Sequence, residues 1–131
     1  MRKEELGAAK PVHPYQWLWE PLESEPSFIL RPMFGTRATY VAGRIVLCFS
    51  ARSGPWHGVL VATDREHHAS LIKELPALAP HSILRKWLFL PDSAAAFEST
   101  AERLVRLVRR HDPRIGVVPS RKKRKGSEMR L

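Results

Sequence analysis

Residues 31–62 read RPMFGTRATYVAGRIVLCFSARSGPWHGVLVA, and this stretch decides the fold. Runs rich in β-branched and aromatic residues are separated here by short breaks that contain glycine. Such a pattern is typical of strands that follow one another through tight turns. The stretch therefore predicts a β-meander, in which each strand pairs antiparallel with the next one.

Five strands are expected when the same pattern is followed outward from this stretch. They lie at residues 28–33, 36–41, 44–50, 56–63 and 83–90, the last as one or two pieces. Because proline lacks a backbone donor, Pro32 places the first of these strands at an edge of the sheet or at a bulge.

Ala42 and Gly43 join the second and third strands. A tight primed turn needs φ > 0 at both of its central residues, and alanine is poor at the first of these positions. We therefore expect a type I turn, followed by Gly43 in the left-handed region and a bulge.

The alternation of side chains along a strand assigns residues to the two faces of the sheet. In the third strand, one face carries Ile45, Leu47 and Phe49, and the other carries Val46, Cys48 and Ser50. The first set is bulkier and is expected to face the helices. In the fifth strand, one face carries Trp87 and Phe89, and the other carries Leu88 and Leu90.

Three helices are expected around the strands. The first covers residues 14–20, because a proline such as Pro14 suits the first turn of a helix, and at Pro21 it stops or restarts as a short tight turn through Glu23. The second follows Thr63, which has the spacing of a capping box with Glu66, and it ends at Pro76. The third covers residues 98–110.

Apolar stripes at helical spacing mark the core-facing sides of the last two helices. These stripes are Ala69, Leu71, Ile72 and Leu75 in one helix, and Ala101, Leu104, Val105 and Val108 in the other. The order helix, strands, helix, strand, helix predicts a two-layer α+β domain, with helices over one face of a five-stranded antiparallel sheet.

The length and the charge distribution predict one domain with a basic tail. A chain of 131 residues is long enough for a single core. We expect a flexible lead-in at residues 1–12, one domain at 13–118 and a disordered tail at 119–131. The tail has a net charge of +5, which is more than half of the +9 of the whole chain.

The composition also bears on the compartment. Cys48 is the single cysteine, so no internal disulfide can form, which fits a reducing environment. No apolar run approaches the ~18 residues of a membrane span, and the first residues lack the apolar core of a signal peptide. We therefore expect a cytoplasmic protein that does not insert into membranes.

An Arg-x-Met-Phe-Gly string starts at residue 31, and an aromatic strand leads into the last helix. In these features the chain resembles the N-terminal domain of the TfoX/Sxy family of competence regulators over residues 13–112, although Thr36 stands where the family usually has a second glycine. The residues that carry this resemblance, which are also the expected partner surface, are Arg31, Met33, Phe34, Gly35, Tyr40 and Gly43. The resemblance implies a small helix-and-sheet module that is associated with regulation and has no established catalysis.

Two of these residues allow a second interpretation. Arg31 and Phe34 flank the Met-Phe-Gly turn and could line a ligand or partner surface. Equally, Phe34 could belong to the core and Arg31 could be a charge on the sheet face, and we favour this structural interpretation.

No metal, cofactor or catalytic site is expected. Asp64 and His68 stand at i and i+4, but no third ligand is near in the sequence, and His67 would point about 100° away from His68 on a helix. Cys48 could be a nucleophile with His57 or His81 as its base. A small buried residue within a strand is the favoured interpretation of Cys48.

Aromatic and basic residues suggest contact with nucleic acid. Trp17, Trp19 and Trp56 could form a base-stacking platform, although core packing is favoured for all three. An unbroken cationic run could bind phosphate backbones through counterion release, or anionic lipid, or only aid solubility. This run consists of Arg121, Lys122, Lys123, Arg124 and Lys125.

These observations leave two main functional hypotheses. The first is a non-enzymatic, regulatory interaction module that binds a protein partner or a second copy of itself, since a meander presents an edge strand. The second is a nucleic-acid-associated protein that uses residues 119–131 as an electrostatic arm. An enzyme that acts on an acidic small molecule is the least supported hypothesis.

Overall fold

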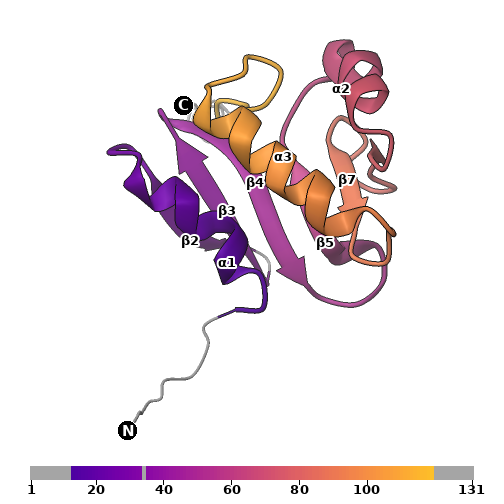
Figure 1. Cartoon of the computed structure of the whole chain (residues 1–131), viewed down its shortest axis with the longest axis horizontal. Helices are drawn as coiled ribbons and strands as arrows, with labels where there is room; N and C mark the ends of the chain where they lie inside the picture. Colours follow the sequence, from indigo (N-terminus) through magenta and orange to yellow (C-terminus); the bar gives the residue numbers. More distant parts are fainter. Residues whose placement is uncertain (1–12, 34, 120–131) are drawn as a thin grey trace, which may run out of the picture.

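The computed structural model describes residues 13–33 and 35–119. Phe34, the expected lead-in and the cationic run therefore lie outside the described residues. The described chain is an α+β structure in which helices cover one face of an antiparallel sheet (Figure 1). Among the described residues, no helix combines the length and apolar character that a membrane crossing needs.

The sheet has six strands in the order β2-β3-β4-β5-β7-β6. Their bounds are β2 (Ile29–Met33), β3 (Thr36–Val41), β4 (Arg44–Ala51), β5 (His57–Val61), β6 (Ala79–Pro80) and β7 (Leu88–Pro91). The α-helices are α1 (Gln16–Trp19), α2 (His68–Glu74) and α3 (Phe97–Arg109). Short 3-10 helices are η1 (Glu20–Ser24), η2 (Gly54–Trp56) and η3 (Arg65–His67).

The expectation of five strands is wrong by one short edge strand. In β6, Ala79 pairs with Phe89 and Pro80 pairs with Leu88. Two residues show no alternation, so the sequence pattern could not reveal this strand. The opposite edge is β2, and Pro32 lies within it as expected. Both edge strands of the sheet therefore contain a proline.

The expected faces of β4 are wrong at its start because of a bulge. Thr39 pairs with Leu47, but the next residue, Tyr40, pairs with Ile45, so Val46 is an extra residue in β4. Val46 and Leu47 both belong to the helix-side core, whereas Ile45 lies on the other face. The expected faces of β7 are confirmed, because Leu88 and Leu90 lie in the helix-side core and Phe89 on the opposite face.

The second helix begins differently from the expected capping box. Residues 65–67 form η3, and α2 begins only at His68. No side chain of the described residues caps η3 or α2. The Thr63 hydroxyl, which the capping box would have used, instead donates a hydrogen bond of 2.6 Å to the Arg114 carbonyl. Thr63 therefore ties the segment after α3 to the end of the sheet instead of starting a helix.

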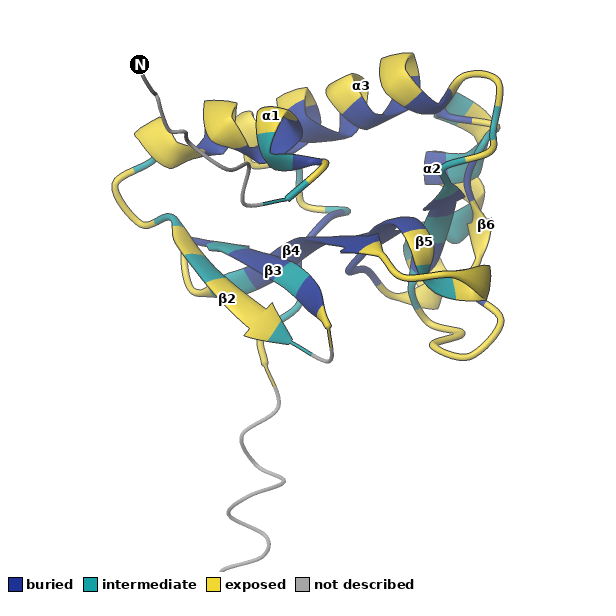
Figure 2. Ribbon diagram, turned by 90° about the horizontal axis from the view of Figure 1, so that it is seen from below, coloured by how far each residue is buried: buried dark blue, intermediate teal, exposed yellow. Residues whose placement is uncertain are grey.

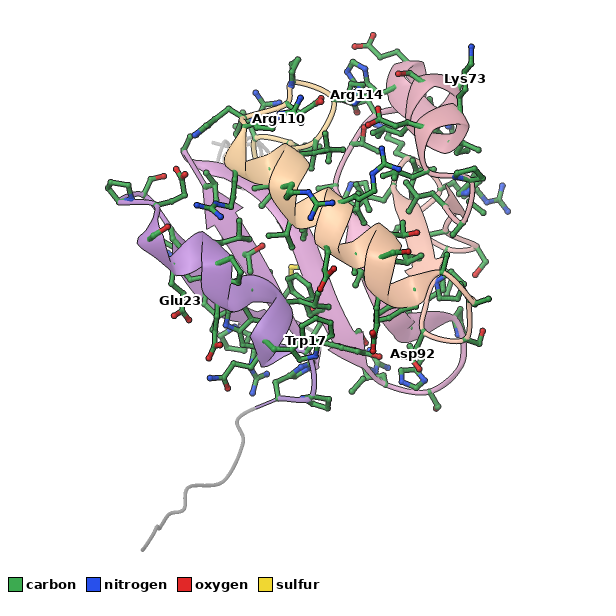
Figure 3. The ribbon with its side chains drawn as sticks, viewed as in Figure 1. Trp17, Glu23, Lys73, Asp92, Arg110 and Arg114 are labelled. Atoms are coloured by element: carbon green, nitrogen blue, oxygen red, sulfur yellow. The ribbon has the colours of Figure 1, made fainter. Side chains whose placement is uncertain are left out.

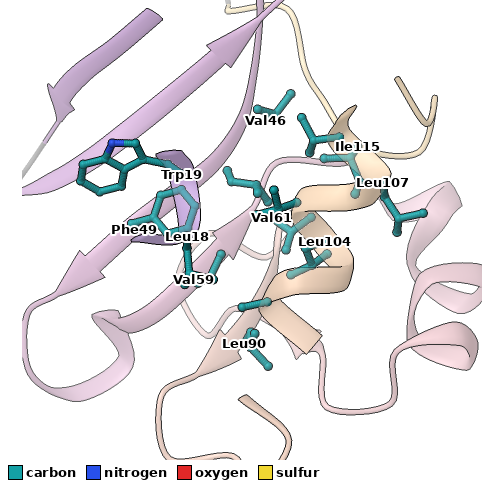
Figure 4. Packing of buried hydrophobic residues seen from close by; sticks show 14 of the residues in the cluster. Leu18, Trp19, Val46, Phe49, Val59, Val61, Leu90, Leu104, Leu107 and Ile115 are labelled. Atoms are coloured by element: carbon teal, nitrogen blue, oxygen red, sulfur yellow. The ribbon is translucent and has the colours of Figure 1, made fainter. Parts of the chain in front are cut away.

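The main core lies between the sheet and the helices (Figure 2). Trp19 is 1% exposed and its ring lies 5.5 Å from that of Phe49 on β4. From α3, Leu104 reaches the sheet residue Val61 and its neighbours (Figure 4). The expected stripe of α3 is buried, and Ile115 from the following segment completes the core.

An ion-pair network fixes the segment after α3. The Arg114 guanidinium donates to Glu74 of α2 at 2.8 Å and to Asp112 at 2.9 Å (Figure 3). The chain then returns to the sheet, where the backbone of Val117 exchanges two hydrogen bonds of 3.0 Å with Ile45. Residues 114–118 are docked on the domain in this way.

The turn between β3 and β4 is a primed turn, contrary to expectation. Ala42 has φ 55° and Gly43 has φ 77°, and Val41 pairs directly with Arg44. Positive φ at both positions is the mark of a type I′ turn, which matches the twist of the flanking strands. The hydroxyl of Ser27 accepts a hydrogen bond of 2.8 Å from the Ala42 N–H, which helps to hold the turn.

Replacing Ala42 by Asn should stabilise the protein. Alanine in the left-handed region is strained by about 1 kcal/mol, whereas asparagine adopts this region readily. Ala42→Asn should therefore raise the free energy of unfolding, measured by urea denaturation, by about 0.5–1 kcal/mol. The control Gly43→Ala should lower it by about 1 kcal/mol, since a Cβ at Gly43 meets no atom within 4 Å and only backbone strain changes. An unchanged or lower stability of Ala42→Asn would contradict the turn assignment.

Candidate functional site

The sheet face opposite the helices, here called the open face, is apolar. A sheet with one covered face usually shows polar side chains on its other face. Here the open face has a buried centre made of Ala38, Ile45, Cys48, Leu60 and Ala62. Partly buried neighbours surround it: Met33, Tyr40, Trp56, Trp87, Phe89 and Val117. Because no described helix lies over this face, it is the candidate functional surface (Figure 2).

A pocket of about 490 Å³ opens in this face. Its lining residues are Met33, Thr36, Cys48, Arg52, Trp56, Leu60, Leu84 and Trp87. Pockets that hold small ligands commonly have volumes of ~300–1,000 Å³, with mostly apolar walls and a few polar groups. By size and by lining, this open-face pocket is suited to hold an apolar group.

Regular strands form one part of the pocket and loops form the rest. Strand alternation brings Thr36, Cys48 and Leu60 from three neighbouring strands to the same face. Trp56 comes from η2, while Leu84 and Trp87 come from the loop between β6 and β7. The pocket therefore depends on how two loops, distant in sequence, are held together.

His81 is the residue that holds these two loops. Its side chain is 1% exposed, and Nδ1 accepts hydrogen bonds from the N–H groups of Ile83 (3.1 Å) and Leu84 (2.9 Å). With Nδ1 acting as an acceptor, the proton is at Nε2, which donates to the Pro55 carbonyl at 2.8 Å. One neutral imidazole thus connects the loop that carries Trp56 to the loop that carries Leu84.

Ring packing and backbone bonds complete this anchor. The His81 ring lies 4.5 Å from that of Trp56 and meets Phe89 edge-on at 5.3 Å. Its backbone N–H donates to the Trp87 carbonyl at 2.9 Å. Sequence reasoning considered His81 only as a base for Cys48 and missed this role. A single buried histidine in an irregular segment has no periodic signal that could have revealed it.

The polar groups of the pocket are few. The Thr36 hydroxyl donates to the Met33 carbonyl at 2.7 Å, and the Arg52 guanidinium lies 5.5 Å from the centre of the Trp56 ring. Burial raises the pKa of the Cys48 thiol to about 12, so the thiol is neutral at ordinary pH. The favoured interpretation of Cys48 as a small buried strand residue is confirmed, since it is 1% exposed.

The structure brings part of the sequence motif onto the open face. Met33 lines the pocket, and the Arg31 guanidinium lies 5.8 Å from the centre of the Tyr40 ring. Gly35, with φ 79°, turns the chain between β2 and β3, where an added Cβ would lie 3.0 Å from the Arg52 side chain. Gly43 serves the turn between β3 and β4 and lines no part of the pocket.

The three tryptophans considered as a stacking platform, Trp17, Trp19 and Trp56, have three different environments, so the expectation that all three would be core residues is confirmed only for Trp19. Trp17 is 44% exposed and borders a groove between α1 and α3, together with Arg106 and Arg109 (Figure 3). Trp56 is half-buried on the open face. The three rings therefore do not share one surface, and Trp56 is the one of them on the open face.

Histidines considered as metal ligands or as a catalytic base contact backbone and carboxylate groups of the protein. His68 shares a hydrogen bond of 2.7 Å with the Lys86 carbonyl through Nε2. Within residues 13–33 and 35–119, no group of three His, Cys, Asp or Glu side chains is placed to hold a metal ion.

At one end of the sheet, the Tyr15 hydroxyl donates to Asp92 at 2.5 Å, with His57 3.8 Å from the same carboxylate. Burial, followed by this hydrogen bond, raises the pKa of Tyr15.

Comparisons with known proteins give no family for the chain. No family model matches it, and neither a curated protein nor a solved structure matches it. The functional argument therefore rests on the geometry and charge of the open face.

Removing the His81 side chain should destabilise the protein strongly. His81→Ala leaves the Pro55 carbonyl and two backbone N–H groups without their partner and opens a cavity, so the free energy of unfolding should fall by about 3 kcal/mol or more. His81→Asn keeps an acceptor near the N–H groups and should lose less. The exposed neighbour Ser82→Ala should change stability by less than about 0.5 kcal/mol. Equal stability of the His81→Ala variant and the wild type, by urea denaturation, would refute the anchor.

The buried thiol predicts a loss of stability in alkali. Because the folded-state pKa of Cys48 is raised to about 12, its contribution is complete below the unfolded-state pKa near 9 and is lost as the pH rises toward 12. From pH 9 to pH 11, the free energy of unfolding of the wild type should fall by about 2 kcal/mol more than that of Cys48→Ala. Parallel pH profiles of the two proteins would show that the thiol does not contribute.

Proposed function

We propose that this protein is a non-enzymatic binding module whose working surface is the open face. Its ligand combines an apolar or aromatic body with negative charge. The observation that carries this proposal is the apolar open-face pocket, whose lining residues come from two segments, 26–63 and 75–91, that contain cations but no acids. An apolar pocket binds an apolar group, and cations around it favour an anion.

The charge separation can be followed along the sequence. Residues 26–63 and 75–91, which contain every strand of the described sheet, include no Asp or Glu. Every acidic residue of the described chain lies at 20–25, 64–74 or 92–112, in or beside the helical segments. The cations of the two acid-free segments are Arg31, Arg37, Arg44, Arg52, Arg85 and Lys86.

The resemblance to the TfoX/Sxy N-terminal domain supports a regulatory, non-catalytic role within this proposal. Arg31, Met33 and Tyr40, which carry part of the resemblance, lie on or beside the surface proposed to bind the ligand. The lone, buried Cys48 fits a cytoplasmic site of action, which we include in the proposal.

The cationic run at Arg121–Lys125 gives a second candidate function, an electrostatic arm for nucleic acid. One structural observation favours it. Val117 pairs with Ile45 and belongs to the open face, and the described chain ends two residues later. The basic segment thus follows in the sequence directly from the surface proposed to bind an anionic ligand.

A dye that has the proposed ligand chemistry tests the pocket. Anilinonaphthalene sulfonate is an aromatic anion whose fluorescence rises in an apolar site, and the folded full-length protein should bind it. Leu84→Glu places a negative charge at the rim of the pocket and should weaken dye binding by about tenfold, or ~1.4 kcal/mol. Leu84 is 37% exposed, so this change should leave the fold intact.

Ile83→Glu is the matched control, because the adjacent residue is 58% exposed and does not line the pocket. It should change dye affinity by less than about twofold. Trp17→Ala controls for the groove beside α3. A loss of dye binding in Trp17→Ala with no loss in Leu84→Glu would place the ligand elsewhere and refute the proposal.

A further inference from the structure

We infer that the open face binds single-stranded nucleic acid, with unpaired bases on its aromatic side chains and phosphates near its cations. The inference rests on the proposed function and narrows its ligand to one chemical class. It is carried by the placement of aromatic rings and cations on the same face of the sheet.

Among the described residues, four aromatic side chains lie on the open face. Tyr40 comes from β3, Trp56 from η2, Phe89 from β7, and Trp87 precedes β7 directly. All four residues are half-buried, so each packs against the protein and keeps part of its surface accessible. Proteins that bind single strands without strong sequence preference use such rings as platforms, because every base has a face that can stack.

Cations accompany these rings. The guanidinium of Arg31 lies 5.8 Å from the centre of the Tyr40 ring, and that of Arg52 lies 5.5 Å from the centre of the Trp56 ring. Arg85 and Lys86 are exposed in the loop that supplies Leu84 and Trp87 to the pocket. A base that stacks on one of these rings would therefore have its phosphate near a positive charge.

The form of the surface favours a single strand over a duplex. In a duplex the base faces are stacked on one another, and only base edges are accessible in the grooves. The open face has a pocket between aromatic side chains, and within the described part of the chain it presents no helix that could enter a major groove. An unpaired base can enter such a pocket, whereas a duplex could contact only the surrounding cations.

The same charges make a second copy of the chain a poorer occupant. Two open faces packed against each other would bring the positive charge of Arg31 and that of its copy into one interface, and residues 26–63 and 75–91 contain no acid that could offset them. The cost of juxtaposing like charges favours an anionic ligand over self-association.

Fluorescence anisotropy of the full-length protein with labelled single strands of about 12 nucleotides tests the inference. Oligouridine, oligothymidine and a duplex of equal length are compared at roughly 50 and 150 mM salt. Trp56→Ala and Tyr40→Ala should each weaken single-strand binding by about tenfold, and Trp17→Ala on the helix side by less than about twofold. Two aromatic variants are used so that a folding defect in one, seen by circular dichroism, leaves the other.

Matched charge changes separate the open face from the rest of the surface. Arg31→Gln with Arg85→Gln should weaken binding and lower the slope of log affinity against log salt by about 1.4, since each phosphate contact in a single strand contributes about 0.7. Arg106→Gln with Arg109→Gln on α3 makes the same charge change on the helix side and should leave this slope unchanged. A further variant replaces the five cations Arg121–Lys125 by Gln in the full-length chain.

Specific outcomes would overturn the inference. The first is that only the replacement of Arg121–Lys125, and no change on the open face, abolishes oligonucleotide binding. The second is that the duplex binds as tightly as the single strand. The third is that no oligonucleotide binds. A dimer that Leu84→Glu dissociates, seen by light scattering, would make a second copy the occupant. If Leu84→Glu still weakens dye binding in any of these cases, the inference about nucleic acid fails and the proposed function stands. If Leu84→Glu has no effect on dye binding, both are refuted.

Discussion

The structure depends on the burial of both faces of β4. Every residue from Ile45 to Ser50 is buried, and β4 pairs with β3 on one side and β5 on the other. One face packs under α1 and α3, where Phe49 meets Trp19. The other face supplies Ile45 and Cys48 to the open face. In a sheet with helices on only one side, an apolar second face is stable in water only at a cost, and binding of a ligand there would offset this cost.

The sequence predicted what regular periodicity determines. The exact bounds of β3, the buried stripe of α3 and the two faces of β7 follow from spacings of two and of 3.6 residues. The prediction from the sequence was wrong where a single residue departs from the regular pattern of its strand, turn or helix. Val46 is an extra residue in its strand, Ala42 adopts a positive φ that alanine disfavours, and Thr63 bonds across the molecule instead of capping a helix. Each of these depends on tertiary contacts that propensity does not include.

The strand residues of the candidate site could be predicted from the sequence, whereas its loop residues could not, because they depend on tertiary contacts. Met33 and Tyr40 were singled out by a motif, and the structure places both on the open face. The loop walls of the pocket depend on His81, whose ring accepts two local hydrogen bonds and donates a third to a residue 26 positions away in the chain. No local pattern encodes such a bond. The sequence already shows that residues 26–63 and 75–91 contain no acids, but only the structure shows that these two segments form one sheet.

The prolines at the two edges of the sheet bear on how the protein behaves when concentrated. An exposed edge strand can template the addition of further strands, which is the route to fibrils. Here Pro32 lies in β2 and Pro80 in β6, so each edge lacks a backbone donor that an incoming strand would need. Growth of the sheet along its hydrogen-bonding direction is thus discouraged at both ends. The protein can therefore carry an apolar face beside these edges without offering the continuous backbone pairing on which amyloid depends.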